Sequence, residues 1–290
     1  MTAASLARDV FGYRFQNPLL LAAGTAGFGR ELDGVSDLDA LGGIVTKAVS
    51  LEPRHGNPPP RVAEFAGGML NSVGLANPGL QAVRDEALPW LTARLKRARI
   101  LVNVVGFREP EYAQVIAGLE SHPGIAGYEL NLSCPNTSAG GVEFGADPES
   151  VRRVVAACRT ATRRALIAKL SPALPDLAAI AEAAVAAGAD GITAINTLPG
   201  YLAGVGGPRL GHGNGGVSGP ALLPVGVLAV RRIRERLPDT PVIGVGGVRS
   251  AADVRQYLEA GAALVAIGTA QLADPRLPER IIHDLESRDG

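Results

Sequence analysis

Cysteine is scarce in this chain of 290 residues, which contains only Cys134 and Cys158. Two thiols are too few for a disulfide framework, and a [2Fe–2S] cluster takes four cysteine ligands. The histidines are few as well and show no metal-ligand spacing; they are His55, His122, His212 and His283. We therefore expect no structural disulfide and no bound metal.

The chain also lacks an excess of charge of either sign, because 28 acidic residues balance 28 basic residues. This balance provides no electrostatic footprint for nucleic acid or for an anionic membrane surface. No segment approaches the roughly 18 uncharged apolar residues of a membrane span, and the N-terminus lacks the apolar core of a signal peptide. Because 47% of the residues are apolar, the chain can build a large core. These features predict a globular, cytoplasmic protein.

Lysine is the third scarce residue, and Lys47, Lys96 and Lys169 are the only lysines among the 28 basic residues. Lys96 lies in the polar helical pattern LTARLKRAR, where a solvated surface position explains it. Lys47 and Lys169 instead stand at the ends of apolar, strand-like runs. Because burial of an unpaired ammonium group is costly, these two lysines are candidates for function.

Short apolar runs alternate with amphipathic helical patterns along the whole chain. Eight runs have the continuous apolar character of parallel strands that are covered on both faces; they are residues 18–22, 43–46, 100–104, 128–132, 166–170, 191–196, 242–245 and 264–267. Helical patterns lie between them, for example at 175–190 and 251–262. Eight strand–helix units predict one (β/α)8 barrel domain over residues 1–290, with an open doubly wound sheet as the alternative.

Long connections and polar strand ends indicate where a ligand would bind. Connections at 50–79, 133–148 and 197–219 all follow predicted strands, which places them on the C-terminal face of a barrel, where barrel enzymes carry their chemistry. Polar groups such as Asn103, Asn131, Lys169 and Asn196 stand at the ends of strands. A helix cap or a satisfied loop explains one or two such groups, but so many on one face favour a ligand site.

Two glycine-containing motifs end the last two predicted strands, GVGG at 244–247 and IGTA at 267–270. Loops at this place commonly bind phosphate in barrels, and glycine allows the backbone to approach the anion closely. The motifs therefore indicate a phosphate-bearing ligand, without identifying it. The alternative is that the glycines only turn a strand into a helix.

At these residues the chain resembles the dihydroorotate dehydrogenases over nearly its whole length. The segments that carry the resemblance are AAGTAGFGRE, TKAVSLEPRHGNPPPR, LNSVGLANPG, ELNLSCPN, FGADPE, AKLSP, INTL, GGVSGPA, GVGGV and IGTA. With cysteine at position 134 the chain resembles the class 1 enzymes, since the membrane-linked class has serine at this position. GTAGFGRE, GNPPPR and FGADPE resemble class 1B more than the fumarate-using class 1A, while the stretch 199–216 resembles the family poorly in its middle.

The resemblance implies a (β/α)8 barrel that binds FMN and oxidises (S)-dihydroorotate to orotate in pyrimidine biosynthesis. It implies that Cys134 is the base that takes the C5 proton, while hydride passes from C6 to flavin N5. The implied substrate contacts are Lys47, Asn71, Gly74, Leu75, Asn131, Asn136, Asn196 and Thr197. The implied FMN contacts are Ala23, Gly24, Lys47, Asn103, Asn131, Lys169, Ile195, Ser218, Gly219, Gly246, Gly247, Gly268 and Thr269. Cys158, in the helical run VRRVVAACRTATRRA, fits a packing thiol better.

Class 1B enzymes pass electrons to NAD through a partner subunit that carries FAD and a [2Fe–2S] cluster. With two cysteines and no GxGxxG motif in a strand–turn–helix unit, this chain cannot do so alone, and we expect a homodimer or a heterotetramer with such a subunit. The close alternatives are a fumarate-linked class 1A-like enzyme and a dihydropyrimidine dehydrogenase-like reductase. A tRNA dihydrouridine synthase would need a basic surface. A sugar-phosphate lyase or isomerase, or a non-catalytic flavin-binding protein, would share only the phosphate loops.

Overall fold

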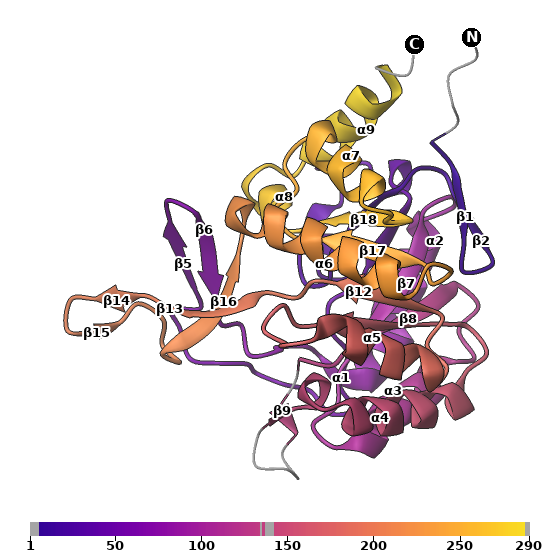
Figure 1. Ribbon diagram of the computed structural model, residues 1–290, viewed down its shortest axis with the longest axis horizontal. Coiled ribbons are helices and arrows are strands. Elements are labelled where there is room, and N and C mark those ends of the chain that lie inside the picture. The colour runs from indigo at the N-terminus through magenta and orange to yellow at the C-terminus, as the bar shows by residue number, and fades with distance from the viewer. Residues whose placement is uncertain (1–5, 134, 137–141, 288–290) are drawn as a thin grey trace.

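A closed barrel of eight parallel strands forms the centre of the protein in a computed structural model, which describes residues 6–133, 135–136 and 142–287. The strand order is β11-β12-β17-β18-β3-β4-β7-β8, and β7, β8, β12, β17 and β18 are labelled in Figure 1. These strands are β3 (Leu19–Leu21), β4 (Gly43–Val45), β7 (Arg99–Val104), β8 (Ile125–Asn131), β11 (Ala165–Leu170), β12 (Gly191–Ala194), β17 (Val242–Val245) and β18 (Leu264–Ile267). The predicted strands and the predicted barrel are confirmed, and closure excludes the open sheet.

The continuous apolar character of these strands follows from burial on both sides. Side chains alternate along a strand, so Leu20, Leu101 and Ile167 fill the barrel interior. Their neighbours, such as Leu21 and Val102, pack outward into the larger core under the helices. Because neither face meets water, polar residues in these strands need a specific reason.

Helices surround the barrel and cover its outer face (Figure 1). They are α1 (Gly79–Ala82), α2 (Leu88–Arg94), α3 (Glu109–Leu119), α4 (Pro148–Ala161), α5 (Leu177–Ala186), α6 (Leu223–Arg236), α7 (Ala251–Glu259), α8 (Thr269–Ala273) and α9 (Leu277–Ser287). A π-helical turn, η3 (Val83–Ala87), joins α1 to α2, and short 3-10 turns are η1 (Arg30–Leu32), η2 (Leu38–Ala40), η5 (Phe144–Ala146) and η6 (Pro220–Leu222). The helices predicted at 175–190 and 251–262 correspond to α5 and α7. Helix α5 starts after Pro175 because the Asp176 side chain caps it, accepting from the Ala179 N–H at 2.9 Å.

A β-hairpin closes the N-terminal end of the barrel. It consists of β1 (Arg8–Val10) and β2 (Tyr13–Phe15), and its Phe15 is fully buried in the interior cluster. Phe11 lies so close to Gly191, the first residue of β12, that a Cβ there would stand 2.5 Å from the Phe11 ring. A ligand must therefore reach the interior from the opposite end.

An antiparallel sheet projects from that opposite, C-terminal end (Figure 1). Its order is β13-β16-β6-β5, with β5 (Val62–Phe65), β6 (Gly68–Asn71), β13 (Leu198–Tyr201) and β16 (Asn214–Ser218). Two further pairs are β9 (Pro135–Asn136) with β10 (Val142–Glu143) and β14 (Ala203–Gly204) with β15 (Gly207–Pro208). Strand β6 belongs to the 50–79 connection and β16 to the 197–219 connection, so these two long connections do lie on one face. The segment 199–216, whose middle resembles the family poorly, forms the β-hairpins of β13 with β16 and of β14 with β15.

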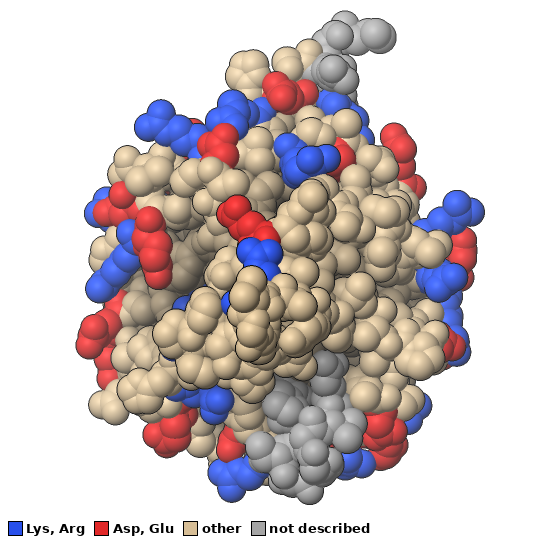
Figure 2. All heavy atoms as spheres, turned by 90° about the vertical axis from the view of Figure 1, so that its left-hand side faces the viewer, with Lys and Arg blue, Asp and Glu red and all other residues tan. Residues whose placement is uncertain are grey.

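The face that carries this sheet has its charged side chains mainly around the rim, and its centre is mostly uncharged (Figure 2). Exposed apolar side chains on the sheet and its hairpin are Val62, Tyr201 and Val205. Among the described residues, no helix is long and apolar enough to cross a membrane.

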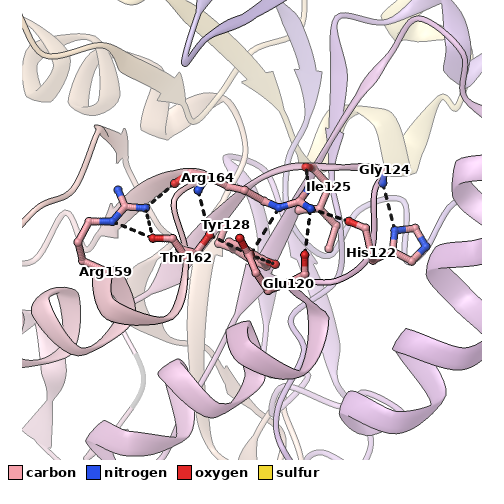
Figure 3. Close-up of polar contacts among 8 residues, drawn as sticks. All are labelled: Glu120, His122, Gly124, Ile125, Tyr128, Arg159, Thr162 and Arg164. Carbon is pink, nitrogen blue, oxygen red and sulfur yellow. Dashed lines mark hydrogen bonds and ion pairs between the residues drawn. The ribbon is translucent and has the colours of Figure 1, made fainter.

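Polar contacts tie together the connections at the N-terminal end of the barrel (Figure 3). The Arg164 guanidinium donates to the carbonyl oxygens of Glu120 (3.0 Å), His122 (2.9 Å) and Ile125, and it lies 3.5 Å from the Glu120 carboxylate. That carboxylate also accepts from the hydroxyl of Tyr128 at 2.9 Å. One side chain therefore holds the turn that leads into β8.

We predict that Arg164→Ala lowers the free energy of unfolding by about 2 kcal/mol, because three carbonyl oxygens lose a charged donor. Thermal or urea denaturation followed by circular dichroism measures the change. The neighbouring Arg163 is exposed, and Arg163→Ala is the matched control, expected to stay within about 0.5 kcal/mol of the parent. Equal stability of the two variants would contradict this role for Arg164.

Candidate functional site

Polar side chains form a buried layer inside the C-terminal half of the barrel. Leu101 of β7 lies in the apolar interior, so Asn103, two residues later, also points inward. Ile167 and Lys169 of β11 have the same relation. Asn103 is 1% exposed and Lys169 is 7% exposed. Groups of this polarity are not buried without partners, and the structure supplies one partner for both.

That partner is Glu129 of β8, which is 1% exposed. Its Oε1 accepts from the Asn103 side-chain amide at 2.7 Å and lies 3.5 Å from the Lys169 Nζ. Its Oε2 accepts from the Thr193 hydroxyl of β12 at 2.8 Å. The three contacts come from three different strands, so the carboxylate joins β7, β11 and β12 across the barrel interior.

The Asn103 amide oxygen has no hydrogen-bond partner among the described residues, although it is buried. Its orientation is fixed, because a carboxylate only accepts and the amide must turn its nitrogen toward Glu129. Reversal would bring the amide oxygen against the carboxylate oxygen. The site therefore presents an acceptor that a ligand with a suitable N–H or O–H group would satisfy.

Two predicted asparagines meet just above this layer. The Asn196 side-chain amide donates to the Asn131 Oδ1 at 3.1 Å, and its own oxygen accepts from the Thr197 N–H at 2.8 Å. The hydroxyl of Tyr112 donates to the Asn131 carbonyl at 2.8 Å. Asn131 and Asn196 are both half-buried, so they are fixed by contacts and still accessible to a ligand.

The antiparallel sheet brings another predicted pair together at Gly216 of β16. The Asn71 side-chain amide donates to the Gly216 carbonyl at 3.2 Å. Thr197 packs against the same glycine, because a Cβ there would lie 2.0 Å from the Thr197 hydroxyl. Gly74 and Leu75, in the loop after β6, both adopt positive φ, 72° and 57°. All of these residues lie in the antiparallel sheet at the C-terminal end of the barrel or in the loops next to it.

Glycines and hydroxyls lie together at the ends of β16 and β18. The Thr269 hydroxyl donates to the Ser218 hydroxyl at 2.7 Å. A Cβ added at Gly24 would meet nothing within 4 Å, and one at Gly268 would meet nothing closer than 3.9 Å. The backbone at both positions therefore faces open space, as close approach of a ligand requires.

The other predicted cofactor residues lie at or near the same strand ends. Gly246 and Gly247 follow β17 with φ of 129° and 74°, and the Tyr257 hydroxyl donates to the Gly246 carbonyl at 2.8 Å. The Lys47 N–H donates to Gly27 at 2.8 Å and the Ile195 N–H to Val245 at 3.0 Å. Ala23 follows β3, and Gly219 follows β16.

Two predicted residues cannot be placed. Cys134 and the side chain of Asn136 lie outside the described residues. Their described neighbour Ser133 lies two residues after the end of β8, and its buried hydroxyl has no partner within the described part of the chain. The roles of Cys134 and Asn136 therefore remain predictions.

Sequence reasoning missed Glu129 and Thr193. Glu129 is a carboxylate in the middle of an apolar strand, in the motif ELNLSCPN, which is itself a signal for a buried partner. Thr193 has no comparable signal, because threonine is common in strands. Only the fold brings these residues to Asn103 and Lys169.

Cys158 is the packing thiol that its helical pattern predicts. It is fully buried in α4, and this burial raises the pKa of its thiol to about 12. Since the thiolate is the reactive form, we expect Cys158 to be unreactive at neutral pH while the protein is folded.

We predict that the Cys134→Ala variant, which keeps only Cys158, reacts with less than about 0.1 equivalent of a chromogenic aromatic disulfide at pH 8 while folded. Unfolding in guanidinium should release about one reactive thiol per chain. Cys158→Ala is the control for reagent access to Cys134. Rapid reaction of the folded Cys134→Ala variant would show that Cys158 is accessible.

Comparisons with known proteins agree with the resemblance drawn from the sequence motifs. The sequence profile of the dihydroorotate dehydrogenase family matches residues 5–288. The chain is 43% identical over 280 residues to the catalytic subunit of dihydroorotate dehydrogenase B (NAD(+)) from Pelobacter propionicus, covering 96% of this chain and 91% of that protein. The subunits of the same name from Listeria monocytogenes and Geobacillus kaustophilus are 43% and 42% identical, over 98% and 97% of this chain and 93% and 89% of theirs.

Proposed function

Because this chain belongs to the dihydroorotate dehydrogenase family, we propose that it oxidises (S)-dihydroorotate to orotate in pyrimidine biosynthesis, as a catalytic subunit of the NAD-linked B type. The family depends on a flavin. The observation that carries the proposal is the buried layer of Asn103, Glu129 and Lys169, which places an ammonium group and an unsatisfied acceptor inside the accessible end of the barrel.

The flavin in this proposal is FMN, which supplies the hydride acceptor when bound. The buried Lys169 ammonium offers the positive charge that stabilises a reduced, anionic ring system. The unsatisfied Asn103 oxygen offers an acceptor to a ring N–H. Gly246, Gly247 and Gly268, with Thr269, would hold the phosphate through backbone N–H groups, and the open space at Gly268 supports that placement.

The substrate in this proposal lies between the flavin and the residues above the polar layer. Asn131 and Asn196 carry side-chain amides, which both donate and accept and so suit a ring that bears N–H and C=O groups together. Asn71 and Asn136 would complete the recognition of the ring and its carboxylate. Cys134 would take the C5 proton on the side opposite the hydride acceptor, as the resemblance implies.

We predict that anaerobic mixing of the flavin-loaded protein with dihydroorotate rapidly bleaches the flavin absorbance near 450 nm. Cys134→Ala should slow this bleaching by about 100-fold or more, because a positioned base contributes 10²–10⁴-fold. Stopped-flow absorbance measures both rates. Cys158→Ala is the control and should bleach as the parent does.

A yellow protein that uracil or thymine bleaches, and dihydroorotate does not, would favour the dihydropyrimidine dehydrogenase-like reductase instead. A protein that binds FMN and is bleached by neither would be a flavin-binding protein without this activity.

We further propose that electrons leave through a partner subunit that carries FAD and a [2Fe–2S] cluster. The similar proteins are named catalytic subunits, which implies a second subunit, and this chain has only two cysteines where such a cluster needs four ligands. Purification from the native host should give a complex that reduces NAD with dihydroorotate. A homodimer that reduces fumarate by itself would point to the class 1A type.

A further inference from the structure

We propose that Glu129 is a positioning residue that sets the reduction potential of the flavin as the fixed counter-charge of Lys169, and that it strengthens flavin binding by orienting Asn103. The inference rests on the flavin binding of the proposed function and concerns a residue that touches the ligand only through others. Three observations support it, namely the burial of Glu129, its set of partners and the unsatisfied atom of Asn103.

The first argument concerns charge. Lys169 is 7% exposed and Glu129 is 1% exposed, with 3.5 Å between Nζ and Oε1. In a buried site such charges are weakly screened, so the field of Lys169 on a nearby ligand is reduced by the carboxylate beside it. Removal of the carboxylate charge would leave the ammonium uncompensated. An anionic, reduced ligand would then be stabilised more than a neutral, oxidised one.

The second argument concerns geometry. The Glu129 Oε1 receives both the Asn103 amide and the Lys169 ammonium, and Oε2 receives the Thr193 hydroxyl. All the partners are donors, which is the arrangement that a carboxylate requires. The bond from Asn103 turns its oxygen away from Glu129, and that oxygen has no partner in the described part of the protein. The hydrogen bond to Glu129 therefore fixes the orientation in which the Asn103 amide oxygen is available to a ligand as an acceptor.

A purely structural role does not explain this arrangement. Well-packed apolar residues stabilise a barrel interior as well as a buried ion pair does, and the layer below, with Leu20, Leu101 and Ile167, is apolar. The pair of Glu129 and Lys169 lies in the C-terminal half of the barrel, next to the end that a ligand can reach. The polar layer thus coincides with the site rather than with the fold as a whole.

The test is a potentiometric titration of FMN-loaded protein with reference dyes, which needs bound flavin but no dihydroorotate. We expect Glu129→Gln, which keeps the shape and removes the charge, to raise the equilibrium constant for two-electron reduction at least tenfold. This corresponds to a midpoint potential about 30 mV more positive. The matched control is Thr193→Val, which removes a hydrogen bond to the same carboxylate and leaves its charge. It should change the constant less than about threefold, or about 15 mV.

Glu129→Asp is the second variant, used if Glu129→Gln does not bind flavin. It retains the charge with a shorter side chain, so we expect a constant within about threefold of the parent, together with weaker FMN binding because Asn103 is no longer held. A Glu129→Gln potential within threefold of the parent, an equal shift in Thr193→Val, or a tenfold shift in Glu129→Asp would each overturn the proposal. Failure of dihydroorotate to reduce the parent would instead contradict the proposed substrate.

Discussion

The carboxylate of Glu129 inside the barrel is the interaction on which the candidate site depends. It is the shared acceptor of Asn103, Lys169 and Thr193, and each of these groups would otherwise be a buried donor. Loss of one partner of a buried ion pair commonly costs about 3–5 kcal/mol, because the other charge is left uncompensated. The barrel can hold an ammonium at this depth only because the opposite charge is built into a neighbouring strand.

The N-terminal end of the barrel carries contacts that stabilise the fold, whereas the C-terminal end carries the candidate site. At the N-terminal end the hairpin that bears Phe15 fills the interior, and Arg164 fixes the turn before β8. At the C-terminal end the interior becomes polar and the backbone at Gly24 and Gly268 faces open space. This division is usual for barrels of this type, and here it follows directly from which residues occupy successive interior positions of the strands.

The eight barrel strands could be predicted from the sequence because each is a local apolar run, and their number indicated closure. The hairpin of residues 8–15 was missed, since RDVFGYRF gives only a short and irregular alternation. The pairing of β6 with β16 was out of reach because it joins segments about 145 residues apart. Glu129 was missed for the same reason: its partners Asn103 and Thr193 are 26 and 64 residues away. Lys47 and Lys169 could be predicted as candidate site residues because lysine is rare in this chain and both follow apolar runs.

The register of β6 on β16, Asn71 opposite Gly216 and Met69 opposite Ser218, has a mechanical consequence. Two connections that leave the barrel after β4 and after β12 share one set of backbone hydrogen bonds, so neither can swing outward alone. A displacement of one connection must therefore either break these hydrogen bonds or carry the other connection with it.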